Sequence, residues 1–507
     1  MYTKSLCPEC AKVVNAKIIE EDGKIIMQKS CNEHGDFKDV YWSDAKLYRK
    51  FERLAWTFSG ISDVASAQNT NCPYECGLCP SHKTCTILAN IDVTNRCNMS
   101  CPVCFANAQK SGMLYEPEKE QIISMMSMLR HQEPVPCSAV QFSGGEPTVR
   151  EDLPELIAAA KKHGFIQIQI ATNGIKLAQS TDYAKRLVME GLNTVYLQFD
   201  GVSSDPYVKM RGFDAYPIKK RTISNCREAG LNSVTLVPTL AKDVNDHQVG
   251  DIIRFAADNR DVVKGVNFQP VSFTGRIDYN EREKKRITIP DLTKLVDEQT
   301  AGEIPPEAWY PVSFVVPISK LLEKIHHKSL PYLTIHPHCG AATYLFVEDL
   351  KLIPITKFID VEGFMEFVRE TVFEYNEKTN KWILLGKVLR KVPSFIDTKH
   401  APKSIDVGNL IIHVLKNGSD EVVKEFHRKA MFLGAMHFQD MFNFDIHRVQ
   451  QCGIHYATPD GRVISFCTYN TLHRKEVEAR FSKPYSISAE ENSKIPVSFT
   501  TNSIEIL

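Results

Sequence analysis

The chain has 507 residues, of which 43% are hydrophobic and 24% charged, and its 61 basic side chains balance 61 acidic ones. This composition is typical of globular domains, and the balanced charge gives no indication of a nucleic-acid or anionic membrane surface as a partner. The first residues lack the apolar core of a signal peptide, and no run of about 18 apolar residues occurs. We therefore expect a cytoplasmic protein of two to four domains, at roughly 100–200 residues per domain, without a transmembrane helix or a nucleic-acid partner.

Cysteine is the residue type that stands out, with fifteen copies, ten of them within the first 104 residues. In a long cytosolic chain, such cysteines favour metal ligation over disulfides. Residues 1–85 are also poor in long periodic segments, so they predict a cysteine-rich domain in which bound metal substitutes for an apolar core. Cys137 and Cys226 lie in apolar or helical surroundings and are predicted to be free thiols.

The first cysteine motif is Cys7-x2-Cys10, followed by Cys31-x2-His34. It resembles a rubredoxin or zinc-ribbon knuckle in which one cysteine is replaced by histidine. The pattern predicts a mononuclear tetrahedral site, and the spacing does not distinguish iron from zinc. His34 is either a ligand or a capping histidine, in which case the fourth ligand comes from elsewhere.

Residues 86–275 alternate between strand-like and helix-like segments. Apolar, strand-like runs lie at 85–94, 138–142, 166–172, 194–200, 234–240 and 265–271, and helix-like segments at 118–132, 153–164, 181–191, 218–230 and 246–259. Each connection is long enough for a helical crossover, so six βα units around a parallel sheet are predicted. A closed eight-unit barrel needs two more units. We therefore expect an α/β fold with an open, partial (β/α)6 TIM barrel.

Residues 276–507 are predicted to form an α+β C-terminal extension. The charged run 280–286 at its start is predicted to be a solvated linker. An apolar segment follows at 311–325, and the region 350–395, including 381–389, is predicted to be rich in strands.

Two cysteine triads share one spacing. Cys97-x3-Cys101-x2-Cys104 directly follows the first predicted barrel strand, and three thiolates fill three corners of a [4Fe–4S] cluster while leaving one iron open. A zinc knuckle is the alternative for this triad alone. The second triad lies in a polar loop with a fourth cysteine close by, and four cysteines saturate a cluster. An auxiliary cluster is therefore predicted on Cys72, Cys76, Cys79 and Cys85.

The motif from Ser143 through Gly144, Gly145 and Glu146 to Pro147 ends the second predicted strand. The carboxyl edge of a parallel sheet is where ligands bind. The glycines are expected to let the backbone approach a ligand closely, and Glu146 is expected to help hold a protonated amine. A simple turn is the alternative interpretation.

With this motif and the first triad in place, residues 86–275 resemble the radical S-adenosylmethionine (SAM) superfamily. The resemblance implies a partial barrel with SAM bound across its top, and Arg211 paired with the SAM carboxylate. It implies further contacts from later strand ends, at Thr172, Asn173, Gln198, Asp200, Phe268 and Gln269. Extensions of such enzymes often carry another cluster, here expected on Cys339, Cys452 and Cys467, with His338, His455, a remote residue or an open site as the fourth position.

The order of five motifs over residues 1–475 gives a closer resemblance. CPYECGLCPSHKTC, DVTNRCNMSCPVCFA, HPHCGAATYLF, MHFQDMFNFDIHRVQQCGIHY and FCTYN together resemble the archaeal tetraether lipid synthase family. That family joins the terminal carbons of two isoprenoid chains of archaeal ether lipids. The resemblance implies an ether lipid substrate, SAM, three [4Fe–4S] clusters, one mononuclear iron or zinc, a low-potential electron donor and peripheral contact with the inner membrane face.

The substrate is the least constrained part of this interpretation. The apolar segments 311–325 and 431–444 are expected to line a lipid tunnel, although Met and Phe at such spacing form ordinary core equally well. One alternative is a radical SAM C-methyltransferase that acts on a pterin-type coenzyme and uses the same scaffold. Another is a cluster-bearing electron-transfer or maturation protein that binds SAM but turns over little.

Overall fold

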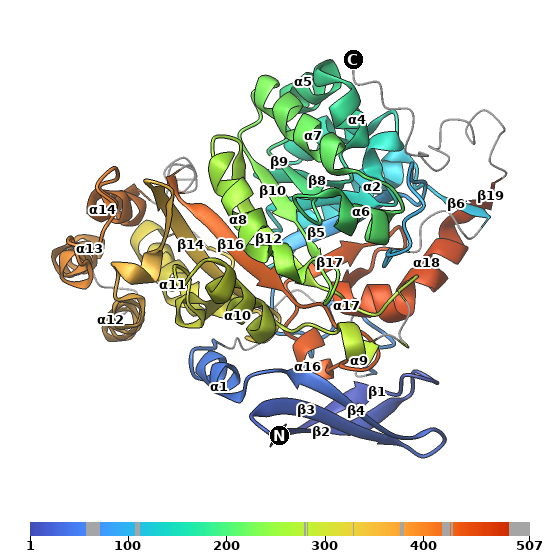
Figure 1. Cartoon of the computed structure of the whole chain (residues 1–507), viewed down its shortest axis with the longest axis horizontal. Coiled ribbons are helices and arrows are strands. Elements are labelled where there is room, and N and C mark those ends of the chain that lie inside the picture. The colour runs from blue at the N-terminus through green and yellow to red at the C-terminus, as the bar shows by residue number, and fades with distance from the viewer. Residues whose placement is uncertain are drawn as a thin grey trace.

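A computed structural model describes residues 1–56, 71–106, 112–277, 280, 282–327, 329–375, 380–417, 426 and 429–485. Figure 1 shows a small N-terminal sheet beneath a large barrel-like sheet, with a group of C-terminal helices to one side. Within the described residues, no helix combines the length and the apolar character needed to cross a bilayer.

The N-terminal domain is a four-stranded antiparallel sheet in the order β1-β2-β3-β4, followed by helix α1, Ala45–Arg53. Its strands are Tyr2–Leu6, Val13–Glu21, Lys24–Cys31 and Gly35–Trp42. Asp22 and Gly23, both with positive φ, form the tight turn between β2 and β3 that an Asp-Gly pair favours. The side chain of Asp44 caps α1 by accepting from two backbone N–H groups.

The six predicted barrel strands are confirmed, and neighbouring strands pair in parallel in chain order. They are β5 Leu88–Thr94, β7 Ala139–Gly144, β8 Gln167–Thr172, β9 Thr194–Gln198, β10 Val234–Val237 and β12 Val263–Pro270. The predicted connecting helices are α2 Lys119–Arg130, α3 Leu153–Lys162, α5 Thr181–Glu190, α7 Tyr216–Glu228 and α8 Val249–Asp258. The predicted strand at 234–240 is divided into β10 and the short β11 Thr239–Leu240, and shorter elements not predicted from the sequence are β6 Met113–Tyr115, α4 Ile175–Gln179 and α6 Ser204–Arg211.

The C-terminal region adds one parallel strand to each edge of this sheet. β16, Met431–Met436, pairs with β12, and β17, Ile454–Ala457, pairs with β5. Beyond them the sheet continues with antiparallel strands, so its path within the described residues does not close. These outer strands are β13 Tyr310–Pro311, β14 Gly340–Glu348, β15 Lys351–Pro354 and β18 Val463–Ser465. The fold is therefore the predicted α/β partial barrel, widened by strands from beyond residue 275.

The prediction of a strand-rich stretch at 350–395 is wrong. After β15 the chain forms helices α12, Val361–Glu374, and α13, Lys381–Lys391. In α13, Leu384, Leu385 and Val388 fall on one helical face and pack into a core shared with α11, Val316–His326. A short apolar run does not distinguish a strand from a buried helix face, and here tertiary packing selects the helix.

The charged run 280–286 is not a solvated linker, although residue 281 lies outside the described residues. Residues Arg282–Lys285 form the short helix α9, and the guanidinium groups of Arg282 and Arg286 are buried against Asp39 and Asp440. Carboxylates from two other parts of the chain neutralise these charges, and this pairing is invisible in the local sequence. The remaining elements are α10 Ile289–Gln299, α14 Val407–Asn417, α16 Ile446–Val449, α17 Phe466–Thr468, α18 Arg474–Phe481 and β19 Ser482–Pro484.

Candidate active site and metal centres

A cavity of about 330 Å³ lies inside the barrel and opens to the carboxyl ends of its strands. It brings together most of the residues predicted to bind SAM or its cluster. They are Cys97, Cys101, Cys104, Ser143, Gly144, Gly145, Glu146, Thr172, Asn173, Gln198, Arg211 and Gln269. Asp200 and Phe268 are fully buried and do not line the cavity.

The three thiols of the first triad lie close enough to act on one another. Burial raises the pKa of Cys97, and the charges of Glu146 and Cys101 raise it further. Burial also raises the pKa of Cys101, with Cys104 adding to the shift and Arg211 opposing it. Buried thiolates that repel one another need a cation, so the donor set fits three-point ligation of an iron–sulfur cluster.

The two glycines of the Ser-Gly-Gly-Glu motif allow close approach to the protein backbone. A Cβ at Gly145 would lie 2.7 Å from the carbonyl carbon of Arg96, and one at Gly144, which has a φ of +126°, would collide with the oxygen of Thr94. The N–H of Gly145 donates to Thr94 O and that of Glu146 to Arg96 O, each at 2.8 Å. The glycines therefore let the end of β7 pack against the backbone of residues 94–96, just before the cluster loop. Both glycines also line the cavity, and their close approach to a ligand stays a prediction.

Glu146 is buried and organises the strand ends around it. Its Oε1 accepts from the backbone N–H and the hydroxyl of Thr148 and from the hydroxyl of Thr172. Its Oε2 accepts from the backbone N–H of Asn173 at 2.7 Å. Since Oε2 has this single partner among the described residues, it keeps an acceptor position for the protonated amine that the sequence assigned to it.

Arg211 braces the cluster loop. Its guanidinium makes a two-point pair with Asp200, at 2.6 and 2.8 Å, and donates to the carbonyl oxygen of Val103 at 2.8 Å. This use of its donors differs from the predicted pairing with the SAM carboxylate, which stays a prediction. Asp200 therefore does not line the cavity, and its link to the site is its ion pair with Arg211.

Lys219 is a site residue that the sequence interpretation missed. Its buried ammonium donates to Gln198 Oε1 at 2.7 Å and to the carbonyl oxygen of Asn173 at 2.6 Å, and burial lowers its pKa to about 8. The helical spacing of Lys219 with Thr222, Ile223 and Cys226 puts it on the buried face of α7, and that spacing was the available signal.

The deeper wall of the cavity is rich in amides. Gln141 donates to Asn90 Oδ1 at 2.6 Å, while Asn267 and Gln269 both donate to the hydroxyl of Tyr196, at 2.5 and 2.9 Å. Apart from Gln269, the sequence interpretation did not single these residues out. Polar residues alternating with apolar ones along β5 and β12 were the signal, because alternate residues of a barrel strand face its interior.

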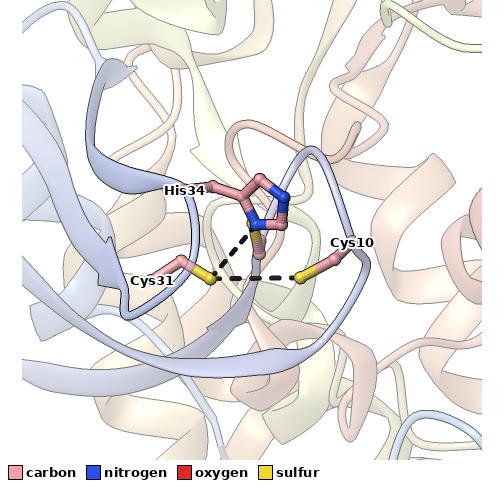
Figure 2. A group of neighbouring side chains, drawn as sticks. Cys10, Cys31 and His34 are labelled. Carbon is pink, nitrogen blue, oxygen red and sulfur yellow. Dashed lines mark hydrogen bonds between the residues drawn. The ribbon is translucent and has the colours of Figure 1, made fainter.

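The mononuclear site is assembled as predicted, and His34 is part of it. All four ligand atoms of Cys7, Cys10, Cys31 and His34 lie within 4.8 Å of one another. Figure 2 shows Cys10, Cys31 and His34 facing a common point, with 3.9 Å between the two sulfurs and 3.5 Å from Cys31 Sγ to His34 Nδ1. Tetrahedral Zn–S bonds of about 2.3 Å place two sulfurs roughly 3.8 Å apart, so the geometry fits such an ion. Backbone N–H groups, first that of Glu33, and then the His34 side chain lower the pKa of Cys31 to about 6.

The thiols of the second triad act on one another, and none of the described interactions of Cys85, the fourth predicted ligand, is with them. Burial raises the pKa of Cys72 to about 12, and the charges of Cys76 and Cys79 contribute to the shift. Cys85 instead lies just before β5. Burial raises the pKa of Cys137, and the charge of Cys85 contributes to this shift. The structure therefore groups Cys72, Cys76 and Cys79 and places Cys85 with a thiol predicted to be free.

The three distant C-terminal cysteines also come together. Burial and then the charges of Cys467 and Cys339 raise the pKa of Cys452, and Cys467 lines the same cavity as the first triad. Arg448 Nε donates to Cys339 Sγ, and the N–H of Gln439 donates to Cys467 Sγ, both at 3.3 Å. Buried thiols with cationic and N–H donors around them fit a cluster.

Two histidines were suggested as the fourth ligand of the C-terminal cysteine group, and the described contacts of both are with other residues. His338 stacks on Tyr48 with 3.9 Å between ring centroids, and His455 Nε2 lies 3.1 Å from His82 Nε2.

Comparison with known proteins agrees with this arrangement. Residues 91–256 match the Radical SAM superfamily, and residues 1–43 match a family described as the HMPTM N-terminal zinc ribbon domain. Together with the cysteine triad at the end of β5, these matches define a radical SAM enzyme with an N-terminal zinc ribbon. A protein of Methanocaldococcus jannaschii, the 7,8-dihydro-6-hydroxymethylpterin dimethyltransferase, is 56% identical over 488 residues, covering 95% of this chain and 96% of its own length. This chain belongs to the family of that protein.

More distant relatives share part of the chain. The GTP 3′,8-cyclase of Clostridium acetobutylicum is 29% identical over 203 residues, which cover 40% of this chain and 61% of the cyclase. Among solved structures, Streptococcus suis SuiB bound to the precursor peptide SuiA is 18% identical with a TM-score of 0.36, covering 43% of this chain and 46% of that one. At that TM-score the likeness to SuiB adds no argument of its own.

The expected lipid coupling activity and ether lipid substrate are contradicted by the Methanocaldococcus jannaschii relative, which is named for a pterin substrate and for methyl transfer. The motifs that suggested a lipid synthase lie around the cofactor and metal centres, and such centres serve many substrates on one fold. The expected lipid tunnel is corrected in part as well. Within the described residues no cavity-lining residue comes from 311–325, while 431–444 contributes Met436, Phe438 and Gln439.

Proposed function

We propose that this protein is a radical SAM methyltransferase that exchanges a C–H bond of a pterin for a C–CH3 bond. One SAM is cleaved to methionine and a 5′-deoxyadenosyl group that takes the hydrogen atom, a second SAM gives up its methyl group and leaves as S-adenosylhomocysteine, and the reductant supplies two electrons. The observation that carries the proposal is the 56% identity, over 95% of this chain, to a 7,8-dihydro-6-hydroxymethylpterin dimethyltransferase. That pterin is therefore the first substrate to test. This proposal is the alternative that the sequence left open, a radical SAM C-methyltransferase that acts on a pterin-type coenzyme.

The amide-rich wall of the cavity supports a polar heterocyclic substrate. Among the described side chains, Asn90 Nδ2 and Asn267 Oδ1 are buried without a hydrogen-bond partner. Both residues line the cavity, so one unpaired donor and one unpaired acceptor are buried in the wall of the space where a substrate would lie. The pyrimidinone edge of a pterin offers acceptors and donors in alternation, and a buried unpaired amide is costly unless a ligand satisfies it.

We further propose three [4Fe–4S] clusters, on Cys97/Cys101/Cys104, on Cys72/Cys76/Cys79 and on Cys339/Cys452/Cys467, and one zinc on Cys7/Cys10/Cys31/His34. When bound, the first cluster supplies the electron that cleaves SAM, and a low-potential donor protein replenishes it. The chain contributes the brace from Arg211 to Val103, the acceptor position on Glu146 and the polar wall.

The test uses anaerobically reconstituted full-length protein with SAM, dithionite and 7,8-dihydro-6-hydroxymethylpterin. Mass spectrometry should find the pterin heavier by one methylene unit per methyl added, together with 5′-deoxyadenosine. Deoxyadenosine formed without any methylated pterin would refute methyl transfer from SAM to this pterin. Absence of deoxyadenosine would refute the radical SAM chemistry itself.

A variant of the polar wall tests how the substrate is held. Asn267→Leu should reduce pterin methylation about fivefold or more, since a lost buried hydrogen bond costs about 1–3 kcal/mol, while SAM cleavage without substrate is retained. Lys264→Gln is the matched control, because Lys264 lies on the same strand and its ammonium is exposed. Equal methylation by both variants would exclude Asn267 from substrate binding.

A further inference from the structure

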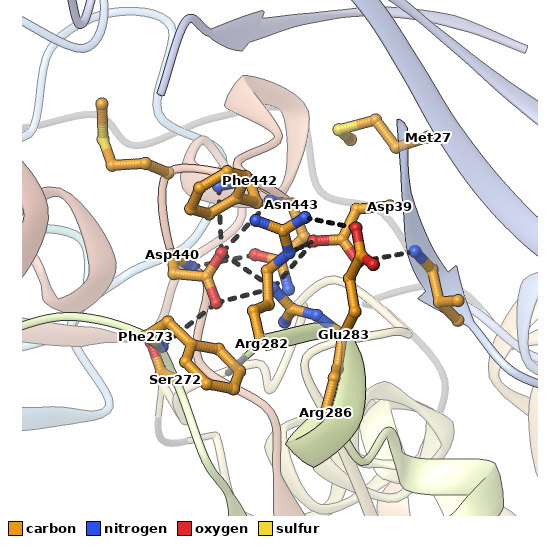
Figure 3. Close-up of polar contacts among 12 residues, drawn as sticks. Met27, Asp39, Ser272, Phe273, Arg282, Glu283, Arg286, Asp440, Phe442 and Asn443 are labelled. Carbon is orange, nitrogen blue, oxygen red and sulfur yellow. Dashed lines mark hydrogen bonds and ion pairs between the residues drawn. The ribbon is translucent and has the colours of Figure 1, made fainter. Parts of the chain in front are cut away.

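The zinc ribbon is joined to the C-terminal region by a buried ion cluster. Arg286 donates to Asp39 of β4 at 2.9 Å and to both carboxylate oxygens of Asp440, at 3.1 and 3.0 Å. Arg282 Nε lies 3.0 Å from the same Asp39. Figure 3 shows the two arginines of the charged run reaching between the two carboxylates. The side chains of Asp39, Arg286 and Asp440 are 8%, 4% and 0% exposed, so solvent screens this cluster little.

Three further contacts run from the ribbon to the same stretch of chain, residues 439–449. Tyr41 and Thr3 donate from their hydroxyls to Asp445, at 2.9 and 2.6 Å, and Asp445 caps helix α16. Lys29 of β3 donates to the carbonyl oxygen of Met441 at 2.7 Å. The ribbon therefore holds the 439–449 segment near its start, at Asp440 and Met441, and again at Asp445, which caps its helix.

The 439–449 segment carries the donors that reach the C-terminal thiols. The backbone N–H of Gln439 donates to Cys467 Sγ, and Arg448 Nε donates to Cys339 Sγ. Asp440 also accepts from the backbone N–H of Phe273, and Ser272 donates to the carbonyl oxygen of Gln439. Asp440, which accepts from Arg286, is therefore next in sequence to Gln439, the donor to Cys467. It is also hydrogen-bonded to Phe273, whose sequence neighbours line the cavity.

We infer that the zinc ribbon is a positioning element for the C-terminal cysteine group, and that Asp39, Arg286 and Asp440 are its positioning residues. By fixing the 439–449 segment, the ribbon fixes two N–H donors aimed at Cys467 and Cys339. A donated N–H stabilises the more negative, reduced form of a cluster and so raises its reduction potential. The inference rests on the proposal that these thiols hold a cluster, but not on the identity of the substrate.

The experiment measures iron content, zinc content and the reduction potential of each cluster by redox titration followed by electron paramagnetic resonance. It uses anaerobically reconstituted full-length protein. Cys467→Ser identifies the signal of the C-terminal cluster by removing it, and Arg448→Met shows how that signal shifts when one donor is lost. Asp39→Asn should shift the potential of this cluster in the same negative direction, with zinc and the SAM cluster unchanged.

Two additional variants guard against simple misfolding. Tyr41→Phe removes only the hydroxyl bond to Asp445 and should produce a smaller shift of the same sign. Arg286→Lys keeps a cation between the carboxylates and should restore most of the potential that Arg286→Met loses. Lys38→Gln is the matched control, because Lys38 precedes Asp39 on β4 but its side chain is exposed and pairs at the surface with Glu21.

The outcomes separate the inference from the cofactor proposal. If Cys467→Ser removes no cluster signal, the C-terminal cluster itself is refuted. If that signal is lost and Arg448→Met shifts it, but Asp39→Asn and Tyr41→Phe behave like Lys38→Gln, the positioning role is refuted. Loss of zinc and of all clusters together in Asp39→Asn and Tyr41→Phe would also refute it, because the ribbon would then serve folding in general.

Discussion

The pair between Asp200 and Arg211 gives the sharpest test of how the chain holds its cluster loop. The two side chains are 0% and 8% exposed, and the pair is joined by bonds of 2.6 and 2.8 Å. Asp200→Asn removes the countercharge while keeping the shape, so the Arg211 cation stays buried without compensation. Breaking a buried pair in this way costs about 3–5 kcal/mol of unfolding free energy.

The same helix supplies the matched control. Asp205 and Lys209 of α6 pair at 2.9 Å, but their side chains are 57% and 51% exposed. Asp205→Asn should therefore cost less than about 1 kcal/mol. Because Arg211 also donates to Val103 O beside Cys104, the loss in Asp200→Asn should extend to the cluster loop, and its cluster should bind less iron.

The assay is urea unfolding of both variants at equal zinc loading, with iron and sulfide analysis after anaerobic reconstitution. Asp200→Asn should unfold at clearly lower urea than Asp205→Asn and retain less of the SAM-cleaving cluster. Equal unfolding midpoints would contradict the assignment of Arg211 as a buried brace. Normal stability combined with weakened SAM binding would instead favour the original prediction that Arg211 meets the SAM carboxylate.

Two further changes test the cluster loop and the ligand sets. Gly145→Ala should abolish SAM cleavage and iron binding at the first triad, because the new methyl group would collide with the Arg96 carbonyl. Its control is Gly386→Ala, at an open helical position, which should change neither iron content nor activity. Cys76→Ser should lose about four iron atoms per chain, whereas Cys85→Ser should keep the iron content of the unaltered protein, and an equal loss in both would return Cys85 to the auxiliary cluster.

The sequence predicted those parts of the fold that depend on local pattern. Six strands and their helices follow from hydrophobic periodicity, and the mononuclear site follows from the spacing of Cys7, Cys10, Cys31 and His34. The pairing of β16 with β12 and of β17 with β5 could not be predicted in this way, since it joins segments far apart in the chain. The burial of Arg286 also depends on distant segments, since its partners are Asp39 and Asp440. The local sequence around Arg286 predicts a solvated charge.

Substrate identity is harder to derive for a related physical reason. The cavity wall joins Asn90 on β5 with Asn267 on β12, and these strands lie at opposite edges of the predicted six-stranded sheet. The added strand β16 contributes Met436 beside Asn267, and α17, which follows β18, brings Cys467 to the same space. The polarity of the cavity is therefore set by how the sheet curves and by which segments flank it. The cysteine motifs, in contrast, are local in sequence, so they identify the cofactor chemistry. The bound molecule depends on amides and other side chains that come together only in the folded barrel.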